Sequence, residues 1–290
     1  MTSESPQRSV KAHSPVDPSI VRVLRSLDPI AKALNCAYFV AGATARDLVL
    51  VNVHGLRPGR ATRDIDFGIA VESWQQFAIF KEALNRTGEF IADSRAQQRL
   101  IYKDQAVGFS IDVDLIPFGG VTSTGRTIAW PPRQDIVMNV AGFEEALANS
   151  VLLEIEQDLI VRIASIPGLT LLKLTAWADR GRESNKDAAD LYRLLAAYAD
   201  AGNTDRLYDE ELDLLEAAGF DMDLAGAELL GRDVARIASS QVMHQVRSLL
   251  ESQPDWDRLA SHMARSTYEE AAPAVDRLLS GFCRGLLRAQ

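Results

Sequence analysis

Two aspartates stand two positions apart in a stretch with the pattern of a β-strand, Asp64-Ile65-Asp66-Phe67. Because side chains alternate between the faces of a strand, Asp64 and Asp66 project to one side while Ile65 and Phe67 face the opposite layer. Parallel carboxylates repel each other unless a cation lies between them, and hard oxygen donors suit Mg²⁺ in sites that also hold phosphates. The pattern therefore predicts a strand that presents paired acids, with Mg²⁺ or Mn²⁺ as cofactor.

A second acidic strand pattern follows at residues 107–116, which we expect to lie beside the first. Its Asp114 would add a third carboxylate and complete a site for one or two metal ions. Asp112 lies on the same strand face and is the alternative third acid.

The composition is that of an ordinary globular protein. The chain has 290 residues, of which 47% are hydrophobic, enough for a sizeable core in two domains or in one domain with a helical extension. No apolar run approaches the roughly 20 residues that span a bilayer, so no membrane partner is expected. Residues 1–17 are rich in Ser and Pro, lack the layout of a secretory signal and are expected to form a disordered leader. Cys36 and Cys283 have no zinc or disulfide spacing, which fits a cytoplasmic protein.

The charge is unevenly distributed. Residues 1–150 contain 16 basic and 16 acidic residues, which leaves 15 basic and 24 acidic residues for the rest of a chain whose net charge is −9. This balance argues against broad nonspecific binding of nucleic acid. It does not exclude a local basic rim, because Arg57, Arg60 and Arg63 lie just upstream of the paired aspartates.

Hydrophobic periodicity divides the chain into two parts. Residues 18–166 alternate between strand and helix patterns, which predicts an α/β (α+β) domain with a mixed sheet. Residues 167–290 show only helical periods, which predicts a C-terminal α-helical domain. The expected strands are 37–40, 63–71, 99–102, 107–116, 136–140, 151–155 and 159–163. The expected helices are 20–34, 44–51, 73–84, 169–180, 187–198, 206–217, 224–250 and 268–288.

A glycine turn lies between the first buried strand and the following helix. At such a turn, Gly42 and Ala43 would direct backbone N–H groups toward phosphate oxygens. Taken alone, glycine there more often serves only the turn geometry. The phosphate interpretation gains support because the next strand carries Asp64 and Asp66.

This succession resembles the DNA polymerase β nucleotidyltransferase superfamily, which has a glycine turn, a helix, an Asp-x-Asp strand and a later third acid. Residues 39–50 and 63–67 resemble the opening of class II tRNA nucleotidyltransferases, but the later Arg-Arg-Asp-Phe-Thr-like and Glu-Asp-x-x-Arg blocks of that family are absent. Ala43 stands where the superfamily often has Ser, which leaves Thr44 or the backbone to hold the triphosphate.

The chain resembles more closely the AbiEii/AbiGii-like nucleotidyltransferases of toxin–antitoxin and phage-defence systems. The resemblance spans residues 37 to about 198 and rests on four segments, 114–120, 128–132, 171–180 and 186–191. It implies NTP as substrate, RNA such as tRNA as the acceptor, and an antitoxin protein as a further partner.

The resemblance also implies roles for individual residues. Asp64, Asp66 and Asp114 would bind the metal and act in catalysis together with Lys173 and Asp190. Without the resemblance, Lys173 would be interpreted as a solvated surface charge. Asp187 and Asp190 share one face of a helix, and their structural alternative is a helix cap and a salt-bridge partner. The expected nucleotide-binding residues are Gly42, Ala43, Thr44, Arg46, Arg63, Lys173 and Arg180.

Other functions remain open at this level. The acceptor is alternatively a protein side chain or a cationic small molecule, which the acidic helical part would suit. The alternative from a non-enzymatic class of function is a catalytically silent nucleotide-binding module that acts by binding a partner.

Overall fold

The computed structural model describes residues 9–60, 62, 64–104, 108–181, 183–265 and 272–288. The chain divides into two compact units, Met1–Ser165 and Ile166–Gln290, one residue before the division expected from the sequence. The predicted fold class is confirmed, since the first unit has a mixed sheet with helices and the described residues of the second form helices.

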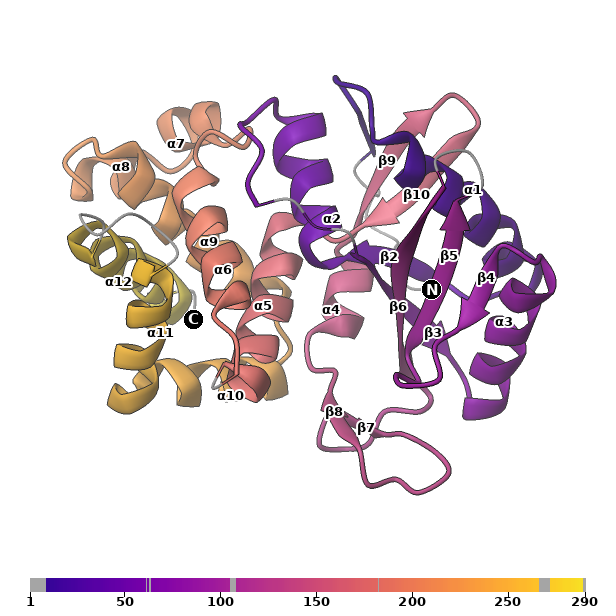
Figure 1. Ribbon diagram of the computed structural model, residues 1–290. Coiled ribbons are helices and arrows are strands. Elements are labelled where there is room, and N and C mark those ends of the chain that lie inside the picture. The colour runs from indigo at the N-terminus through magenta and orange to yellow at the C-terminus, as the bar shows by residue number, and fades with distance from the viewer. Residues whose placement is uncertain are drawn as a thin grey trace, which may run out of the picture. The chain divides into compact units, whose positions relative to one another are not determined.

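Within the described residues, the first unit contains an eight-stranded sheet in the order β1-β9-β10-β2-β3-β6-β5-β4 (Figure 1). The pairs β1/β9, β10/β2 and β3/β6 are parallel, and the other neighbours are antiparallel. The strands are β1 (Ser9–Lys11), β2 (Tyr38–Ala41), β3 (Asp64–Val71), β4 (Phe90–Ala92), β5 (Arg99–Asp104), β6 (Phe109–Gly119), β9 (Val151–Glu156) and β10 (Leu159–Ile163). A separate hairpin pairs β7 (Thr127–Ala129) with β8 (Val137–Asn139).

One face of the central strands is apolar and packs against α1 (Pro18–Ala33) and α3 (Trp74–Arg86). Phe67 of β3 and Val113 of β6 are fully buried there, as strand alternation predicts for the residues next to the aspartates. The hydroxyl of Tyr38 donates a hydrogen bond to Asp28 of α1 at 3.0 Å, which ties this helix to the sheet.

The opposite face is divided along the strands. At one end the rings of Phe39, Phe118 and Phe143 pack with centroids 5.6–6.0 Å apart, and Phe143 opens the short helix α4 (Phe143–Ala148). Gly68 makes room for this cluster, because a Cβ there would lie 2.4 Å from the Phe39 ring. The aspartates of β3 and β6 occupy the other end of the same face.

The helix that follows the glycine turn changes its winding. We expected one helix over residues 44–51, whereas α2 (Gly42–Asp47) continues as the π-helical segment η1 (Leu48–Val53). The N–H of His54 bonds to the carbonyl of Val49 at 3.1 Å, an i to i+5 spacing that widens the turn.

The prediction of a disordered leader over residues 1–17 is wrong for its described part. Ser9–Lys11 form β1 and pair with β9, while residues 1–8 lie outside the described residues. Asn52 of η1 anchors the connection to α1, since its carbonyl accepts from the His13 N–H at 2.7 Å and its amide donates to the Pro15 carbonyl at 3.0 Å. Backbone pairing and this side chain compensate for the low apolar content of the segment.

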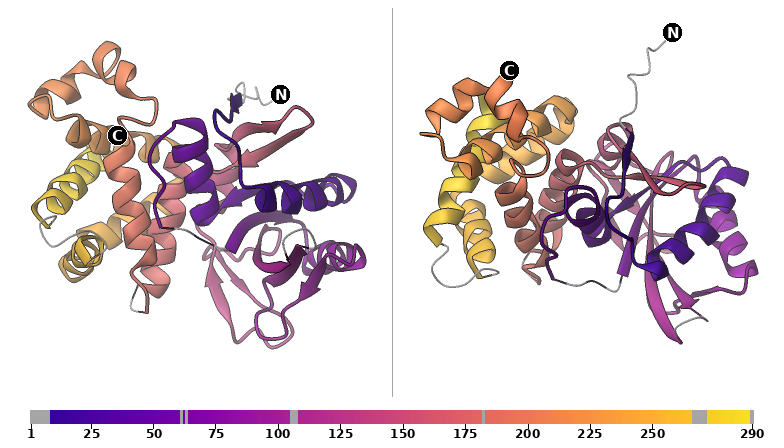
Figure 2. Two further views of the ribbon diagram at one scale, coloured as in Figure 1. Left: turned by 45° about the horizontal axis from the view of Figure 1, so that its top comes forward. Right: turned by 90° about the horizontal axis from the view of Figure 1, so that it is seen from above.

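The second unit is built from helices, which Figure 2 shows in salmon to yellow. They are α5 (Ile166–Arg180), α6 (Lys186–Ala197), α7 (Thr204–Asp209), α8 (Leu212–Ala217), α9 (Met222–Ile237), α10 (Ser240–Glu251), α11 (Gln253–Arg265) and α12 (Ala272–Arg288). None of the helices in the described part of the chain combines the length and apolarity needed to cross a membrane.

Two helices expected from periodicity are each divided in two. The expected helix 206–217 forms α7 and α8, and 224–250 forms α9 and α10. In the second case Ala238 is extended and the Ser239 side chain accepts from the Val242 N–H at 3.4 Å, so an N-cap restarts the helix. Of the expected helix 268–288, residues 268–271 lie outside the described residues.

Glycines allow α9 and α12 to approach closely. A Cβ at Gly231 would lie 2.1 Å from the Phe282 carbonyl oxygen, and one at Gly285 would lie 1.8 Å from that of Glu228. The backbones of the two helices are therefore in direct contact, which no larger residue at these positions permits.

Candidate active site

The carboxylates of the first unit are set by the parallel pairing of β3 with β6. Asp64 pairs with Asp112, and Asp66 pairs with Asp114. Since neighbouring strands lie about 4.8 Å apart, the four side chains form two adjacent pairs on one face of the sheet. The structure thus brings the three predicted metal ligands together, with the alternative third acid beside them. Asp114 is the less exposed of the two candidates, at 13% of its side chain against 45% for Asp112.

Gly42 is shaped for the approach of Asp66. It has a φ of +63°, and a Cβ at this position would lie 1.8 Å from Oδ2 of Asp66. The carboxylate of Asp66 therefore lies against the glycine turn, in space that any side chain at position 42 would occupy.

The residues after Gly42 are buried. The Thr44 hydroxyl donates to the backbone carbonyl of Asp64 at 3.0 Å, which ties α2 to the start of β3. Ala43 is buried, and buried Arg46 forms two 2.9 Å bonds to Asp47 and one of 3.2 Å to the carbonyl of Arg60. Arg63, which we also expected at the site, lies outside the described residues.

Arg99 of β5 is a member of the site that we did not predict. It lies opposite Asp114 in the antiparallel β5/β6 pairing. Its Nε and Nη2 donate to the two oxygens of Asp114, each at 2.8 Å, and its Nη1 donates to Asp112 at 2.7 Å. Hydrogen bonding to Asp114 and the nearby charges of Asp112 and Asp64 raise the pKa of the guanidinium. The alternation of side chains along β5 predicts which residues share a face with Arg99. The register that pairs Arg99 with Asp114 cannot be predicted from the sequence pattern.

The donor chemistry of the β3/β6 face fits a hard divalent cation. The donors are carboxylate oxygens, the ligand type of Mg²⁺ and Mn²⁺ rather than of zinc. Among the described residues, no three His, Cys, Asp or Glu side chains are already arranged as a metal site. The bidentate contact with Arg99 accounts for the orientation of Asp114. The aspartates are therefore of the right residue type and on the right strand face to bind the predicted metal. The side chains of Asp112 and Asp114, however, are oriented by their bonds to Arg99.

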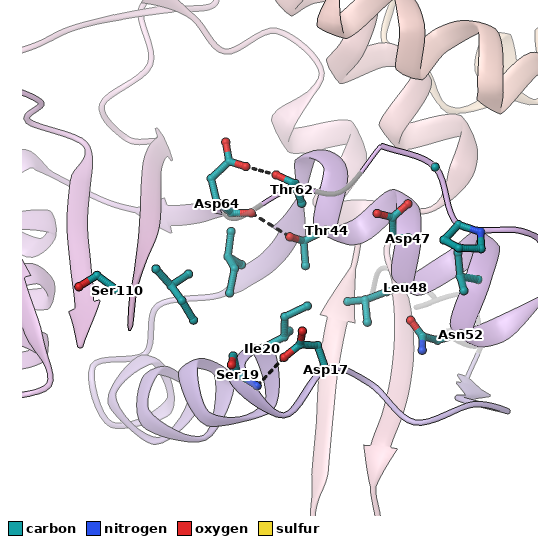
Figure 3. Close-up of a pocket in the computed structure, with 15 residues that line it drawn as sticks. Asp17, Ser19, Ile20, Thr44, Asp47, Leu48, Asn52, Thr62, Asp64 and Ser110 are labelled. Atoms are coloured by element: carbon teal, nitrogen blue, oxygen red, sulfur yellow. Dashed lines mark hydrogen bonds between the residues drawn. The ribbon is translucent and has the colours of Figure 1, made fainter. Parts of the chain in front are cut away.

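A pocket of about 640 Å³ lies beside Asp64, between the start of α1, the segment η1 and the first residues of β3 and β6 (Figure 3). Leu48, Ile65 and Ile111 contribute apolar walls. Asp17 and Asp47 line it as well, and its described lining includes no Lys or Arg. Thr62 donates to the Asp64 carboxylate at the edge of this pocket.

The predicted residues of the second unit form a buried ionic cluster. The ammonium of Lys173 on α5 lies 3.0 Å from Asp187 and 2.7 Å from Asp190, both on α6. Arg180 adds a 2.8 Å bond to Asp187. Lys173 is only 8% exposed, so it is not the solvated surface charge that its residue type suggests, whereas the Arg180 side chain is 60% exposed.

Opposing effects act on Asp187. Burial alone raises its pKa, but the charges of Lys173 and Arg180 and their hydrogen bonds outweigh burial and leave the pKa below its usual value. Because the folded-state pKa is lowered, the ionised carboxylate stabilises the protein above the unfolded pKa of about 3.9, and this contribution is lost as the pH falls through the folded value.

One known protein family and several solved structures are similar to this chain. The family described as "Nucleotidyl transferase AbiEii toxin, Type IV TA system" matches residues 25–280. No curated protein matches. An antigenic nucleotidyltransferase-like protein from Paracoccidioides brasiliensis is similar, with 15% identity, a TM-score of 0.42 and coverage of 70% of this chain and 93% of that one.

Two further solved structures are similar at this level. The antibiotic-resistance factor ANT(2'')-Ia has 12% identity and a TM-score of 0.35, and the match covers 70% of this chain and 98% of that one. A CCA-adding enzyme in complex with ATP has 14% identity and a TM-score of 0.33, and the match covers 95% of this chain and 80% of that one.

We predict that Gly42→Ala weakens Mn²⁺ binding at least tenfold, because the new Cβ displaces the Asp66 carboxylate. The positive φ adds a stability loss of about 1–3 kcal/mol. Mn²⁺ titration and urea unfolding measure the two effects. Gly55→Ala is the matched control, since Gly55 has a φ of +69° but no atom within 4 Å of the position that a Cβ would take. Equal Mn²⁺ affinity in both variants would contradict the role of Gly42.

We predict that Asp187→Asn destabilises the protein at pH 7 by about 1.5–3 kcal/mol, the range for hydrogen bonds to charged groups. The difference from the unsubstituted protein should begin to shrink below about pH 4, where Asp187 is protonated in the unfolded state, and should continue to shrink as the pH falls through the lower folded-state pKa. Urea unfolding at pH 7 and pH 3, followed by tryptophan fluorescence, measures it. In Asp213→Asn, which removes a surface partner of Arg232, the change should stay within about 1 kcal/mol. A pH-independent difference would show that Asp187 does not act through its charge.

Proposed function

Because the chain belongs to the AbiEii family of nucleotidyl transferase toxins, we propose that it transfers a nucleoside monophosphate from an NTP to an acceptor hydroxyl and releases pyrophosphate. The observation that carries the proposal is the β3/β6 pairing, which sets Asp64 beside Asp112 and Asp66 beside Asp114 on one face. Grouped carboxylates of this kind suit a reaction in which a polyphosphate and a divalent cation are bound together.

Asp64, Asp66 and Asp114 would hold Mg²⁺ or Mn²⁺, which when bound neutralises phosphate charge and acidifies the acceptor hydroxyl. In the transfer, the acceptor oxygen forms a bond to the α-phosphorus while the bond to the bridging oxygen of the β-phosphate breaks. Pyrophosphate leaves with the electron pair, and the hydroxyl proton passes to Asp114 as general base. Each carboxylate oxygen of Asp114 carries two lone pairs, so Asp114 has room for this proton as well as for the cation.

The nucleotide-binding roles follow from exposure. For Gly42, Ala43 and Thr44 we propose contact with the triphosphate through backbone N–H groups, since the Ala43 and Thr44 side chains are buried. Arg180 presents an exposed guanidinium suited to a phosphate. For the buried pair Lys173–Asp190 we propose a catalytic role on the basis of the family resemblance.

The proposed nucleotide-binding roles of Arg46 and Arg63 rest on other observations. Arg46 is bonded to Asp47 and to a carbonyl, so we propose that it holds the turn for the nucleotide. Arg63 remains a proposed phosphate ligand on the basis of its place directly before Asp64.

For the acceptor we propose RNA, such as a tRNA end, in a toxin–antitoxin setting with an antitoxin protein as partner. Exposed Arg57 and Arg60 precede β3 and would contact the phosphates of an incoming strand. The cytoplasm is the proposed compartment, where the free thiols of Cys36 and Cys283 would persist.

The pocket beside Asp64 favours a second candidate, a cationic small-molecule acceptor. Asp17 and Asp47 line this pocket, and its described lining includes no basic residue. Arg46 already binds Asp47, so the charge of Asp17, together with that of Asp64, would be the main attraction for an amine in this pocket.

We predict that the protein transfers label from one or more α-labelled NTPs to RNA in the presence of Mg²⁺, and that Asp66→Asn abolishes both this transfer and stabilisation by Mg²⁺. Incubation of each labelled NTP with total RNA, and separately with polyamines and aminoglycosides, identifies the acceptor class. Glu82→Gln, at an exposed position of α3, is the charge-matched control and should remain active. Label in small molecules alone would select the second candidate, and no label in either fraction would refute both acceptor classes.

We predict that RNA binding weakens steeply as salt rises, and that Arg57→Gln and Arg60→Gln each flatten the log–log salt dependence by about one unit. Fluorescence anisotropy of labelled tRNA at several salt concentrations measures the slopes. Arg86→Gln at the exposed end of α3 serves as control and should leave the slope unchanged. Salt-independent binding would count against an RNA acceptor.

A further inference from the structure

The guanidinium of Arg99 binds Asp114, one of the proposed metal ligands. Its contacts to Asp114 form a two-point fork with both distances at 2.8 Å, and a third bond of 2.7 Å reaches Asp112. A planar fork of this kind is the strongest common arrangement between arginine and a carboxylate. The Arg99 side chain is 28% exposed, so solvent only partly screens the interaction.

The charge of the four aspartates explains why the Arg99 guanidinium is bound on this face of the sheet. Four carboxylates and one guanidinium, taken together, leave an excess of three negative charges among these five side chains. Arg99 approaches from β5, on the outer side of β6, and binds Asp112 and Asp114 directly. It therefore offsets the repulsion within the β6 pair, whereas Asp64 and Asp66 on β3 lie on the far side of that pair.

A metal ion at the same face meets this arginine as a competitor. The fork uses a lone pair on each oxygen of Asp114, and a metal that binds Asp114 through both oxygens needs those same positions. Even a metal bound through one oxygen places its charge close to the guanidinium, which like-charge repulsion disfavours.

We propose that Arg99 is an exchangeable counter-ion: it holds Asp114 and Asp112 in the metal-free protein and yields Asp114 when a divalent cation binds. This inference rests on the proposed function and adds a residue that sets metal affinity. Arg99 keeps the affinity for the bare cation low. Once displaced, its guanidinium adds positive charge beside the site, so metal and the polyphosphate anion bind cooperatively.

The test is Mn²⁺ binding to Arg99→Gln, by calorimetry on the full-length protein without nucleotide or acceptor. Loss of the competing cation should tighten Mn²⁺ binding roughly tenfold or more, from the worth of a hydrogen bond to a charged group. The same variant should melt at a lower temperature without metal and regain more stability than the unsubstituted protein when Mn²⁺ is added. Arg99→Lys keeps the charge without the planar fork and should bind with intermediate affinity.

Arg25→Gln is the matched control in the same unit. Arg25 forms a fork with Asp158 at 2.8 and 2.9 Å and also contacts Glu156, away from β3 and β6. Its loss should leave Mn²⁺ affinity unchanged.

The possible outcomes distinguish the counter-ion role of Arg99 from the proposed metal site itself. If Asp66→Asn and Asp114→Asn weaken Mn²⁺ binding but a folded Arg99→Gln binds equally or less tightly than the unsubstituted protein, the counter-ion role is refuted and the metal site stands. If the aspartate variants do not affect Mn²⁺ binding, the metal site itself is refuted. Should Arg99→Gln fail to fold, Arg99→Lys decides: affinity equal to or below that of the unsubstituted protein overturns the inference.

Discussion

Electrostatic repulsion among the aspartates of β3 and β6 is the constraint on which the site depends. The parallel register aligns acid with acid, Asp64 with Asp112 and Asp66 with Asp114, where a sheet would ordinarily place neutral or opposite partners. The fold supports this arrangement from both sides. The apolar residues of the same strands are fully buried under α1 and α3, and Arg99 binds the acids of β6. Burial thus stabilises a strand pair that charge opposes.

The second unit handles buried charge differently. In the cluster of Lys173, Asp187 and Asp190, cation and anions are on adjacent helices and each is bonded to an opposite charge. Elsewhere in this unit, Asp233 accepts hydrogen bonds from Arg206 at 2.6 and 2.7 Å and from the Tyr198 hydroxyl at 2.5 Å. These buried charges are paired with one another, so loss of a shared partner such as Lys173 or Asp233 leaves the opposite charges with fewer partners and destabilises the cluster.

Local periodicity predicted the faces of the strands but not their registers. The alternation of Asp64, Ile65 and Asp66 determined which side chains share a face, and the observed burial confirms it. The position of Arg99 opposite Asp114 depends on the pairing of β5 with β6, and a slip of one residue would have sent Arg99 to the other face. Burial of Lys173 was not predictable for a related reason, because residue type predicts exposure and only the packing of α5 against α6 reverses it. The division of α9 from α10 depends on a single cap at Ser239, whose signal is short compared with the helical pattern around it.

The π-helical winding of η1 changes the direction in which the residues after it point. A π-turn holds one residue more than the corresponding α-turn, so every position beyond it is rotated relative to an uninterrupted helix begun at Gly42. Asn52 acquires its direction from that rotation, and with it the contacts to His13 and Pro15 that bring the N-terminal segment to the edge of the sheet. The attachment of β1 is therefore encoded as much in the number of residues between Gly42 and Asn52 as in their identity.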